Sequence, residues 1–195
     1  MLDAGEHVAS LATVVDGSPW IVPMLYARVG DRVLLHGSTG AGALRHVAAG
    51  SPAALCVNHL DGWVYAHTLF DSSANYRSAV VRGVLTRLSG NEAAEALTQL
   101  SERVFPGRSG EVPPHSSRQL AATQALALDI VEGQWTVKIR SGQPGQPDDG
   151  DDVPADLWTG VLPIRTVYGT PETADRVAAG VPVSASVLSY VEAKR

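Results

Sequence analysis

Residues 8–36 read VASLATVV-DGSP-WIVPMLYARV-GD-RVLLH, and this stretch decides the fold class. Val8–Val15 and Trp20–Val29 are rich in apolar and β-branched residues, which favours strands. The DGSP and GD segments between the runs are tight-turn signals. Pro23 lacks an amide donor, so its part of the strand is expected at an edge, at a bulge or against a ligand. The stretch therefore predicts an antiparallel meander.

Apolar runs and turn signals continue to about residue 140. Further strands are predicted at Pro52–His59 and Trp63–Phe70, joined by a turn at Asp61-Gly62, and then at Tyr76–Leu88, Ala125–Val131 and Gln134–Ile139. Helical spacing and capping residues predict helices at 40–49, 92–104, 116–123 and 184–193. Many short antiparallel strands with helices added between them indicate a mainly β (α+β) protein built on a small β-barrel.

The composition changes at residue 141. Residues 141–154 contain Gly, Pro, Gln and four aspartates, which is typical of a flexible surface connector. Trp158–Tyr168 is apolar enough to dock on another surface. We therefore divide the chain into a barrel domain, 1–140, and a linker with a C-terminal segment, 141–195, that docks on the barrel or on a dimer partner.

The overall composition excludes several classes of protein. The 195 residues are 45% hydrophobic and carry a net charge of −5, which argues against nucleic-acid binding. Only 18% are charged, which favours a subunit interface. Cys56 is the single cysteine, so no internal disulfide forms. No run of 18 apolar residues and no leader pattern occurs, so we expect a cytoplasmic protein without a membrane span.

Common catalytic signatures are missing from the sequence. The six histidines form no HExxH motif, so we expect no metal site. The chain has no Gly-x-Ser-x-Gly elbow, and no Lys-Ser/Thr follows the glycine-rich stretch after His36, which excludes an α/β-hydrolase and a Walker loop. The turns are too short for the parallel βαβ units of a classical dinucleotide fold.

Two polar stretches at strand ends remain as candidates for one anion site. His36-Gly37-Ser38-Thr39-Gly40 leaves backbone amides open near a helix start, although it could equally be a plain strand-to-helix turn. In Asn75-Tyr76-Arg77-Ser78, strand alternation turns Tyr76 and Ser78 one way and Arg77 the other. The Arg77 fork suits a phosphate, but a solvated charge is the simpler interpretation. The two stretches can share a ligand only if their strands are neighbours.

Several short motifs occur in the same order along the chain as in a known family. They are Met24-Leu25-Tyr26, Leu35-His36-Gly37-Ser38, Leu60-Asp61-Gly62, Asn75–Val81, Val104-Phe105-Pro106-Gly107-Arg108 and Trp158-Thr159-Gly160-Val161-Leu162-Pro163. In this order and spacing they resemble the pyridoxamine 5′-phosphate oxidase-like, FMN-binding split-barrel family. The similarity is greatest to its branch of nitroimidazole-resistance (Nim-type) proteins, and it extends from about Ser10 to Tyr168.

The resemblance implies a six-stranded split β-barrel with Greek-key character and a few peripheral helices, which forms a homodimer with FMN at the interface. It implies that His36 is catalytic, as a proton donor beside the reactive centre. The cofactor contacts that it implies are Pro23, Met24, Leu25 and Tyr26 along the flavin ring, His36, Gly37 and Ser38 beside the ring and the ribityl arm, Tyr76, Arg77 and Ser78 at the phosphate or ribityl group, and Lys138 and Trp158 closing the site.

One position departs from the family pattern. Relatives carry Arg or Lys where this chain has Gly42, and Arg45 is the nearest replacement as a phosphate ligand. The function that the resemblance implies is an FMN-dependent oxidoreductase that reduces a small oxidised acceptor, with nitroaromatics among the candidates. A non-catalytic flavin- or haem-binding module with a storage, sensing or protective role is the alternative, and F420 in place of FMN stays open.

Overall fold

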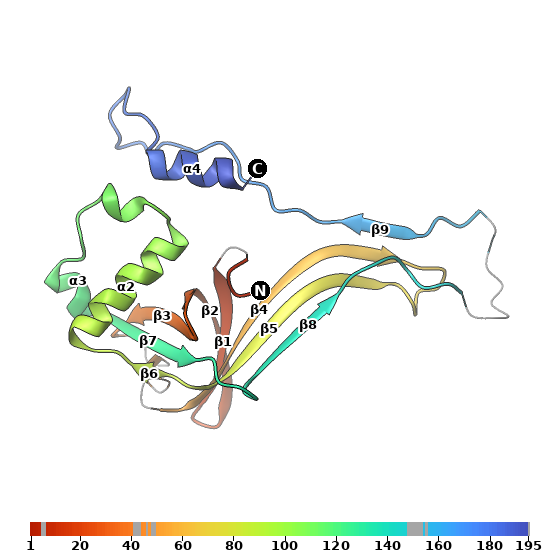
Figure 1. Ribbon diagram of the computed structural model, residues 1–195, viewed down its shortest axis with the longest axis horizontal. Helices are drawn as coiled ribbons and strands as arrows, with labels where there is room; N and C mark the ends of the chain where they lie inside the picture. Colours follow the sequence, from red (N-terminus) through yellow and green to blue (C-terminus); the bar gives the residue numbers. More distant parts are fainter. Residues whose placement is uncertain are drawn as a thin grey trace.

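The computed structural model describes residues 1–4, 7–40, 44–45, 47, 50–147, 154 and 156–194. The described part is mainly β, with nine strands and four helical segments (Figure 1). The strands are β1 (Val8–Val15), β2 (Ser18–Val29), β3 (Arg32–Ser38), β4 (Pro52–Tyr65), β5 (Ser73–Val84), β6 (Thr86–Arg87), β7 (Thr123–Asp129), β8 (Trp135–Arg140) and β9 (Gly160–Pro163). The helices are α2 (Gly90–Val104), the 3-10 helix η1 (Arg108–Gly110), α3 (Ser117–Ala122) and α4 (Ala185–Ala193).

The strands form one curled antiparallel sheet in the order β6-β7-β3-β2-β1-β4-β5-β8, and β9 also pairs with β4. The long strand β2 joins the two halves, because residues 18–25 pair with β1 and residues 26–29 pair with β3. The curl brings β5 against β7, where a Cβ on Gly83 would lie 3.0 Å from Leu128 Cδ1. Tyr26, Leu35 and Leu55 fill the interior with other apolar residues. The predicted mainly β split barrel is confirmed.

Helix α2 covers the outer face of β2, β3 and β7. Its apolar side, with Leu97 and Leu100 at the centre, packs on Ala27, Ala125 and Ala127. These alanines lack bulk, so the helix axis can approach the sheet closely. The packing places the C-terminal end of α2 above the middle of β2, next to the candidate site.

The β4–β5 pair extends beyond the barrel as a long arm, with β8 on its other edge (Figure 1). The predicted turn at Asp61-Gly62 is wrong: β4 continues through it with only a bulge between Leu60 and Gly62. The Asp61 carboxylate accepts bonds of 2.8 and 2.7 Å from Arg77, and its carbonyl accepts from Ile164 N at 3.0 Å. These partners hold the dipeptide extended, while Gly62 leaves room for β9.

Other predicted boundaries shift by a few residues. The strand expected at Tyr76–Leu88 is divided into β5 and β6, with Leu85 buried between them. The strand expected to reach Phe70 stops at Tyr65. The sequence offers Ser116 or Ser117 as the cap of α3, and the structure has Ser116, which forms a capping box with Gln119. The helix expected at 40–49 and the position of Gly42 lie largely outside the described residues.

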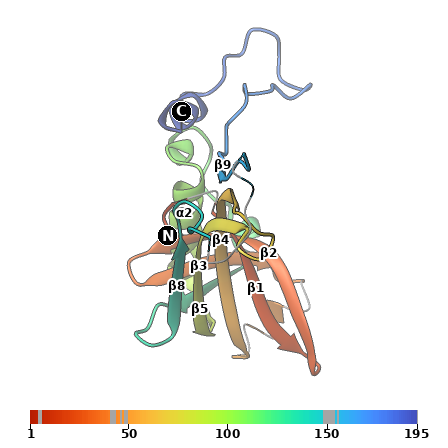
Figure 2. The same cartoon turned by 90° about the vertical axis from the view of Figure 1, so that its right-hand side faces the viewer.

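The C-terminal segment runs back over the same chain. After β9 pairs with β4, the chain returns along the barrel and ends in α4, which lies beside α2 and η1 (Figures 1 and 2). Glu111 accepts hydrogen bonds from Ser186 N at 2.9 Å and Ser186 Oγ at 2.6 Å. Within the described ranges, none of the helices is both long and apolar enough to cross a membrane.

Candidate functional site

The predicted flavin strand, Pro23–Tyr26, lies in the middle of β2. Met24 and Tyr26 point into the barrel and are buried, whereas Leu25 faces outward toward α2. The Tyr26 hydroxyl donates to the Leu2 carbonyl at 2.9 Å. Pro23 pairs with Ser10 of β1, and β3 begins to pair with β2 only at Tyr26. The predicted edge position of Pro23 is confirmed, because in the described sheet this part of β2 has a neighbour on one side only.

His36, Gly37 and Ser38 are the last three residues of β3, and strand alternation turns Gly37 away from the other two. Gly37 faces the barrel interior, where a Cβ would collide with Leu44. His36 is half-buried on the opposite side, and no described residue bonds its Nδ1 atom. Burial, and to a smaller degree the nearby His115, lowers the pKa of His36 below 6.5. The Ser38 hydroxyl accepts from Gly40 N at 3.2 Å, so it helps to form the local turn.

The arm residues alternate as the sequence predicts. Ser78 pairs with Lys138, and the Lys138 ammonium lies 5.5 Å from the centre of the Tyr76 ring. Arg77 pairs with His59 on the opposite face. Tyr76, Ser78 and Lys138 therefore form one polar group, and Arg77 belongs to another.

Strand register relates this polar group to β2. Leu25 pairs with Val8, and Asn58 pairs with Ser78 and through it with Lys138. Ser10 of β1 pairs with Cys56 of β4. Two residues further along this antiparallel pair, Val8 therefore lies opposite Asn58. Leu25, Ser78 and Lys138 thus lie on one line across the outer face, with β2 and β5 about 14 Å apart at three strand spacings. Within one chain Leu25, Ser78 and Lys138 share a face, whereas Met24, Tyr26 and Arg77 lie on the other, so the predicted contacts do not form one compact pocket.

Arg77 faces a separate polar cleft. Its guanidinium donates hydrogen bonds to both carboxylate oxygens of Asp61, and this contact lowers the pKa of Asp61. His59 and Arg165 also line the cleft, which has a volume of about 520 Å³. The bidentate pair shows that the Arg77 fork is already directed at a carboxylate. Its predicted role as a phosphate ligand stays a prediction.

The remaining predicted contacts lie further out. Trp158 is 65% exposed and packs against Tyr65 on the arm, with ring centres 5.8 Å apart. Arg45 is helical and exposed. The predicted cofactor roles of Trp158 and Arg45 therefore rest on the resemblance alone.

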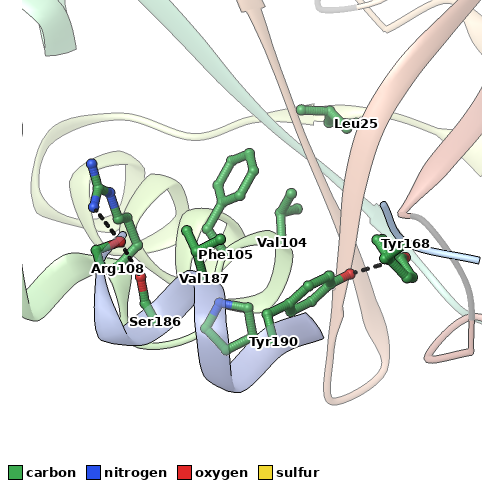
Figure 3. A pocket seen from close by; sticks show the side chains of 10 residues that line it. Leu25, Val104, Phe105, Arg108, Tyr168, Ser186, Val187 and Tyr190 are labelled. Atoms are coloured by element: carbon green, nitrogen blue, oxygen red, sulfur yellow. Dashed lines mark hydrogen bonds between the residues drawn. The ribbon is translucent and has the colours of Figure 1, made fainter. Parts of the chain in front are cut away.

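A cavity of about 740 Å³ lies between β2, the end of α2 and α4 (Figure 3). Leu25 is the one predicted site residue on its wall. The lining is Leu25, Val104, Phe105, Pro106, Arg108, Tyr168, Ser184, Ser186, Val187 and Tyr190. Sequence reasoning missed this cavity, since half of its wall comes from the C-terminal segment. The helix break at Phe105-Pro106-Gly107 and the apolar terminal helix were the available signals.

An antiparallel split half-barrel with a helix on its outer face and a cavity beside β2 defines the class of split-barrel proteins. The family model described as pyridoxamine 5′-phosphate oxidase matches residues 1–136, and the chain belongs to this family. The predicted family is confirmed. No curated protein sequence matches the chain.

Two solved structures are similar along almost the whole chain. The FAD and Heme binding protein from Mycobacterium smegmatis is 42% identical, with a TM-score of 0.91 over 96% of this chain and 90% of that one. The flavocytochrome Anf3 from Azotobacter vinelandii is 29% identical, with a TM-score of 0.85 over 96% and 86%.

A Bacteroides thetaiotaomicron protein assigned to 5-nitroimidazole antibiotic resistance is 17% identical, with a TM-score of 0.57 over 68% of this chain and 76% of that one. At this identity the likeness concerns the fold alone.

Proposed function

We propose that this protein is a flavin-binding redox protein that reduces a small oxidised acceptor. The observation that carries the proposal is the position of Leu25. It belongs to the β2 stretch that the family resemblance assigns to the flavin ring, and it opens onto the 740 Å³ cavity. This volume lies within the usual range of small-molecule pockets, about 300–1,000 Å³, so an acceptor can lie beside that strand. The names of the two similar structures, which mention FAD and a flavocytochrome, support a flavin.

The residues present fit such a cofactor. The outer edge of β2 at Pro23 offers backbone carbonyls, and the His36 Nδ1 atom is buried without a described partner. Tyr76, Ser78 and Lys138 would hold the phosphate arm on the outer face. The flavin, when bound, supplies the redox chemistry.

His36 is the proposed catalytic residue. Because burial lowers its pKa, the neutral imidazole dominates at pH 7. In that form one ring nitrogen donates a hydrogen bond and the other accepts one. His36 therefore orients the reactants with a hydrogen bond and takes on a full positive charge only at lower pH.

A second copy of the chain is part of the proposal. Leu69 and Phe70 at the tip of the arm are each 96% exposed, and Trp135, Val137 and Ile139 on β8 are also exposed. Trp135, Val137 and Ile139 alternate along β8 and so face one way, and an exposed apolar stripe of this kind is typical of a subunit interface. A homodimer mass in light scattering would support this arrangement, and a monomer at micromolar concentration would contradict it.

The absorbance spectrum of the purified protein tests the function. We expect flavin bands that a nicotinamide donor bleaches and a nitroaromatic restores. Mass spectrometry of the released cofactor decides between FMN, which the motifs imply, and FAD, which the name of the 42% identical structure favours. A colourless protein that takes up neither flavin would refute the proposal.

The phosphate role of Arg77 has its own test. The resemblance predicts that Arg77→Ala weakens flavin binding, whereas a phosphate arm held only by Tyr76, Ser78 and Lys138 on the other face predicts unchanged binding. Arg82→Ala, on the same strand but exposed, is the control. Equal flavin affinity in both variants would show that Arg77 serves only its pair with Asp61.

A non-catalytic flavin- or haem-binding module is the second candidate. The word Heme in the name of the 42% identical structure favours it, as does the buried, unbonded Nδ1 atom of His7, which resembles that of His36 within the described residues. A Soret band on haem addition, lost in His36→Ala or His7→Ala, together with bound flavin that no acceptor reoxidises, would favour this candidate over the enzyme.

A further inference from the structure

We infer that the cavity between β2, α2 and α4 binds an uncharged, planar aromatic molecule, and that this molecule is the electron acceptor. The first statement stands on the cavity itself. The second rests on the proposed function, because it needs a flavin along β2.

The walls of the cavity are apolar on both sides (Figure 3). Leu25 and Val104 come from the barrel and α2, Phe105 from the end of that helix, and Val187 from α4. Apolar walls stabilise an apolar ligand by removing its surface from water. The cavity is large enough for a two-ring aromatic and still within the usual range for ligand pockets.

The charges around the cavity cancel. Among the lining residues Arg108 alone carries a formal charge, and its Nη1 atom donates to Glu111 Oε2 at 2.9 Å and to Ser184 Oγ at 3.1 Å. Hydrogen bonds from Ser186 and Arg108 also keep Glu111 ionised, since they lower its pKa to about 2. An ionic ligand would lose its hydration here without gaining a counter-charge, so the cavity favours an uncharged ligand.

The polar atoms at the edge of the cavity suit a ligand with an oxygen that accepts a hydrogen bond. The hydroxyls of Tyr168 and Tyr190 lie 3.4 Å apart, and their rings meet edge to face with centres 5.4 Å apart. In Figure 3 the Tyr190 hydroxyl points to Tyr168 at the margin of the cavity. Either oxygen of the pair can be the donor, so the pair can adapt to a carbonyl or nitro oxygen.

The class of acceptor follows from these features. A quinone is planar, uncharged and carries carbonyl oxygens, and its ring would lie against Leu25 on the flavin strand. The quinone would gain two electrons and two protons to become a hydroquinone, and the fully reduced flavin would lose the same two electrons and two protons. A nicotinamide donor would then reduce the flavin again.

Menadione is the probe, and its binding to the purified full-length protein is measured by calorimetry. Val187→Trp fills the cavity from α4, and Leu188→Trp is its matched control, since Leu188 is exposed on the same helix and does not line the cavity. We expect Val187→Trp to raise the menadione Kd about tenfold or more and Leu188→Trp to leave it unchanged. Equal menadione affinity in the two variants, with circular dichroism showing both folded, would overturn the site.

The hydroxyl pair has a milder variant. Tyr190→Phe keeps the ring and is expected to raise the menadione Kd several-fold without changing the flavin content. If added flavin displaces menadione, the flavin itself fills the cavity and the proposed acceptor site is wrong. If menadione binds a protein that takes up no flavin, the binding site holds while the acceptor role and the proposed function fail.

Charge gives a second, independent readout. Lawsone is the 2-hydroxy analogue of menadione and is ionised at neutral pH, so we expect it to bind more weakly than menadione. Glu111→Gln keeps an acceptor for Ser186 but leaves Arg108 without its counter-charge. We expect this variant to bind lawsone about tenfold more tightly than the wild type does, which is the size of one charge-assisted hydrogen bond. Tighter binding of lawsone than menadione by the wild type would contradict the inference.

Discussion

Gly62 of β4 pairs with Pro163 of β9, and its replacement by alanine is expected to loosen β9. A Cβ at this position would lie 2.9 Å from the Leu162 carbonyl oxygen, 3.2 Å from Val161 Cγ1 and 3.3 Å from Pro163 Cα. Two of these three atoms belong to the backbone, so a side-chain rotation cannot relieve the contact. The strand itself has to move.

The size of the effect follows from the packing. Inserting a methyl group into a well-packed contact costs about 1–3 kcal/mol. β9 has four residues and pairs with β4 alone in the described sheet, so it can move away without disturbing the barrel. The free-energy cost then destabilises the paired position of β9. The equilibrium constant for local opening of β9 is expected to increase about 5- to 150-fold.

Amide hydrogen exchange measures this opening. Ile164 N donates to the Asp61 carbonyl at 3.0 Å, directly after β9, so its exchange is expected to accelerate by the same factor. Leu126, in the barrel core, is expected to keep its exchange rate. Gly169→Ala is the control, because a Cβ there meets no atom within 4 Å. Unchanged exchange at Ile164 in a folded Gly62→Ala protein would refute the reasoning.

Two further predictions concern pH. The folded-state pKa of His36 is lowered from 6.5, so the neutral ring favours the fold above pH 6.5 and this stabilisation is lost as the pH falls toward the folded pKa. His36→Gln is therefore expected to flatten the fall of Tm between pH 7 and about 5, and parallel profiles would contradict the assignment. The pKa of Glu111 is lowered from 4.5 to about 2, so its hold on α4 is complete above pH 4.5 and is lost as the pH falls toward 2. Exchange at Ser186 N is expected to accelerate over that range in the wild type and to show no such step in Glu111→Gln.

Much of the fold could be predicted because its signals are local. The meander from β1 to β3 follows from apolar runs and glycine turns, and α3 follows from a capping serine at its start. Alternation along one strand was enough to separate Arg77 from Ser78. The family followed from the order of short motifs, and the family model confirms it.

The bulge at Asp61-Gly62 and the cavity at Leu25 depend on partners far along the chain. An Asp-Gly pair is compatible with a turn as well as with a strand. Here the bond from Arg77 to Asp61 and the Leu162 backbone beside Gly62 keep the pair extended. The cavity needs α4 beside the barrel, and Glu111, directly after η1, bonds Ser186 of α4 although the two residues are 75 positions apart.

The sequence by itself determined the strands, their alternation and the family, since turn, cap and pleat preferences act over a few residues. Tertiary structure alone decided which side chains meet, because that depends on the packing of remote segments against one another.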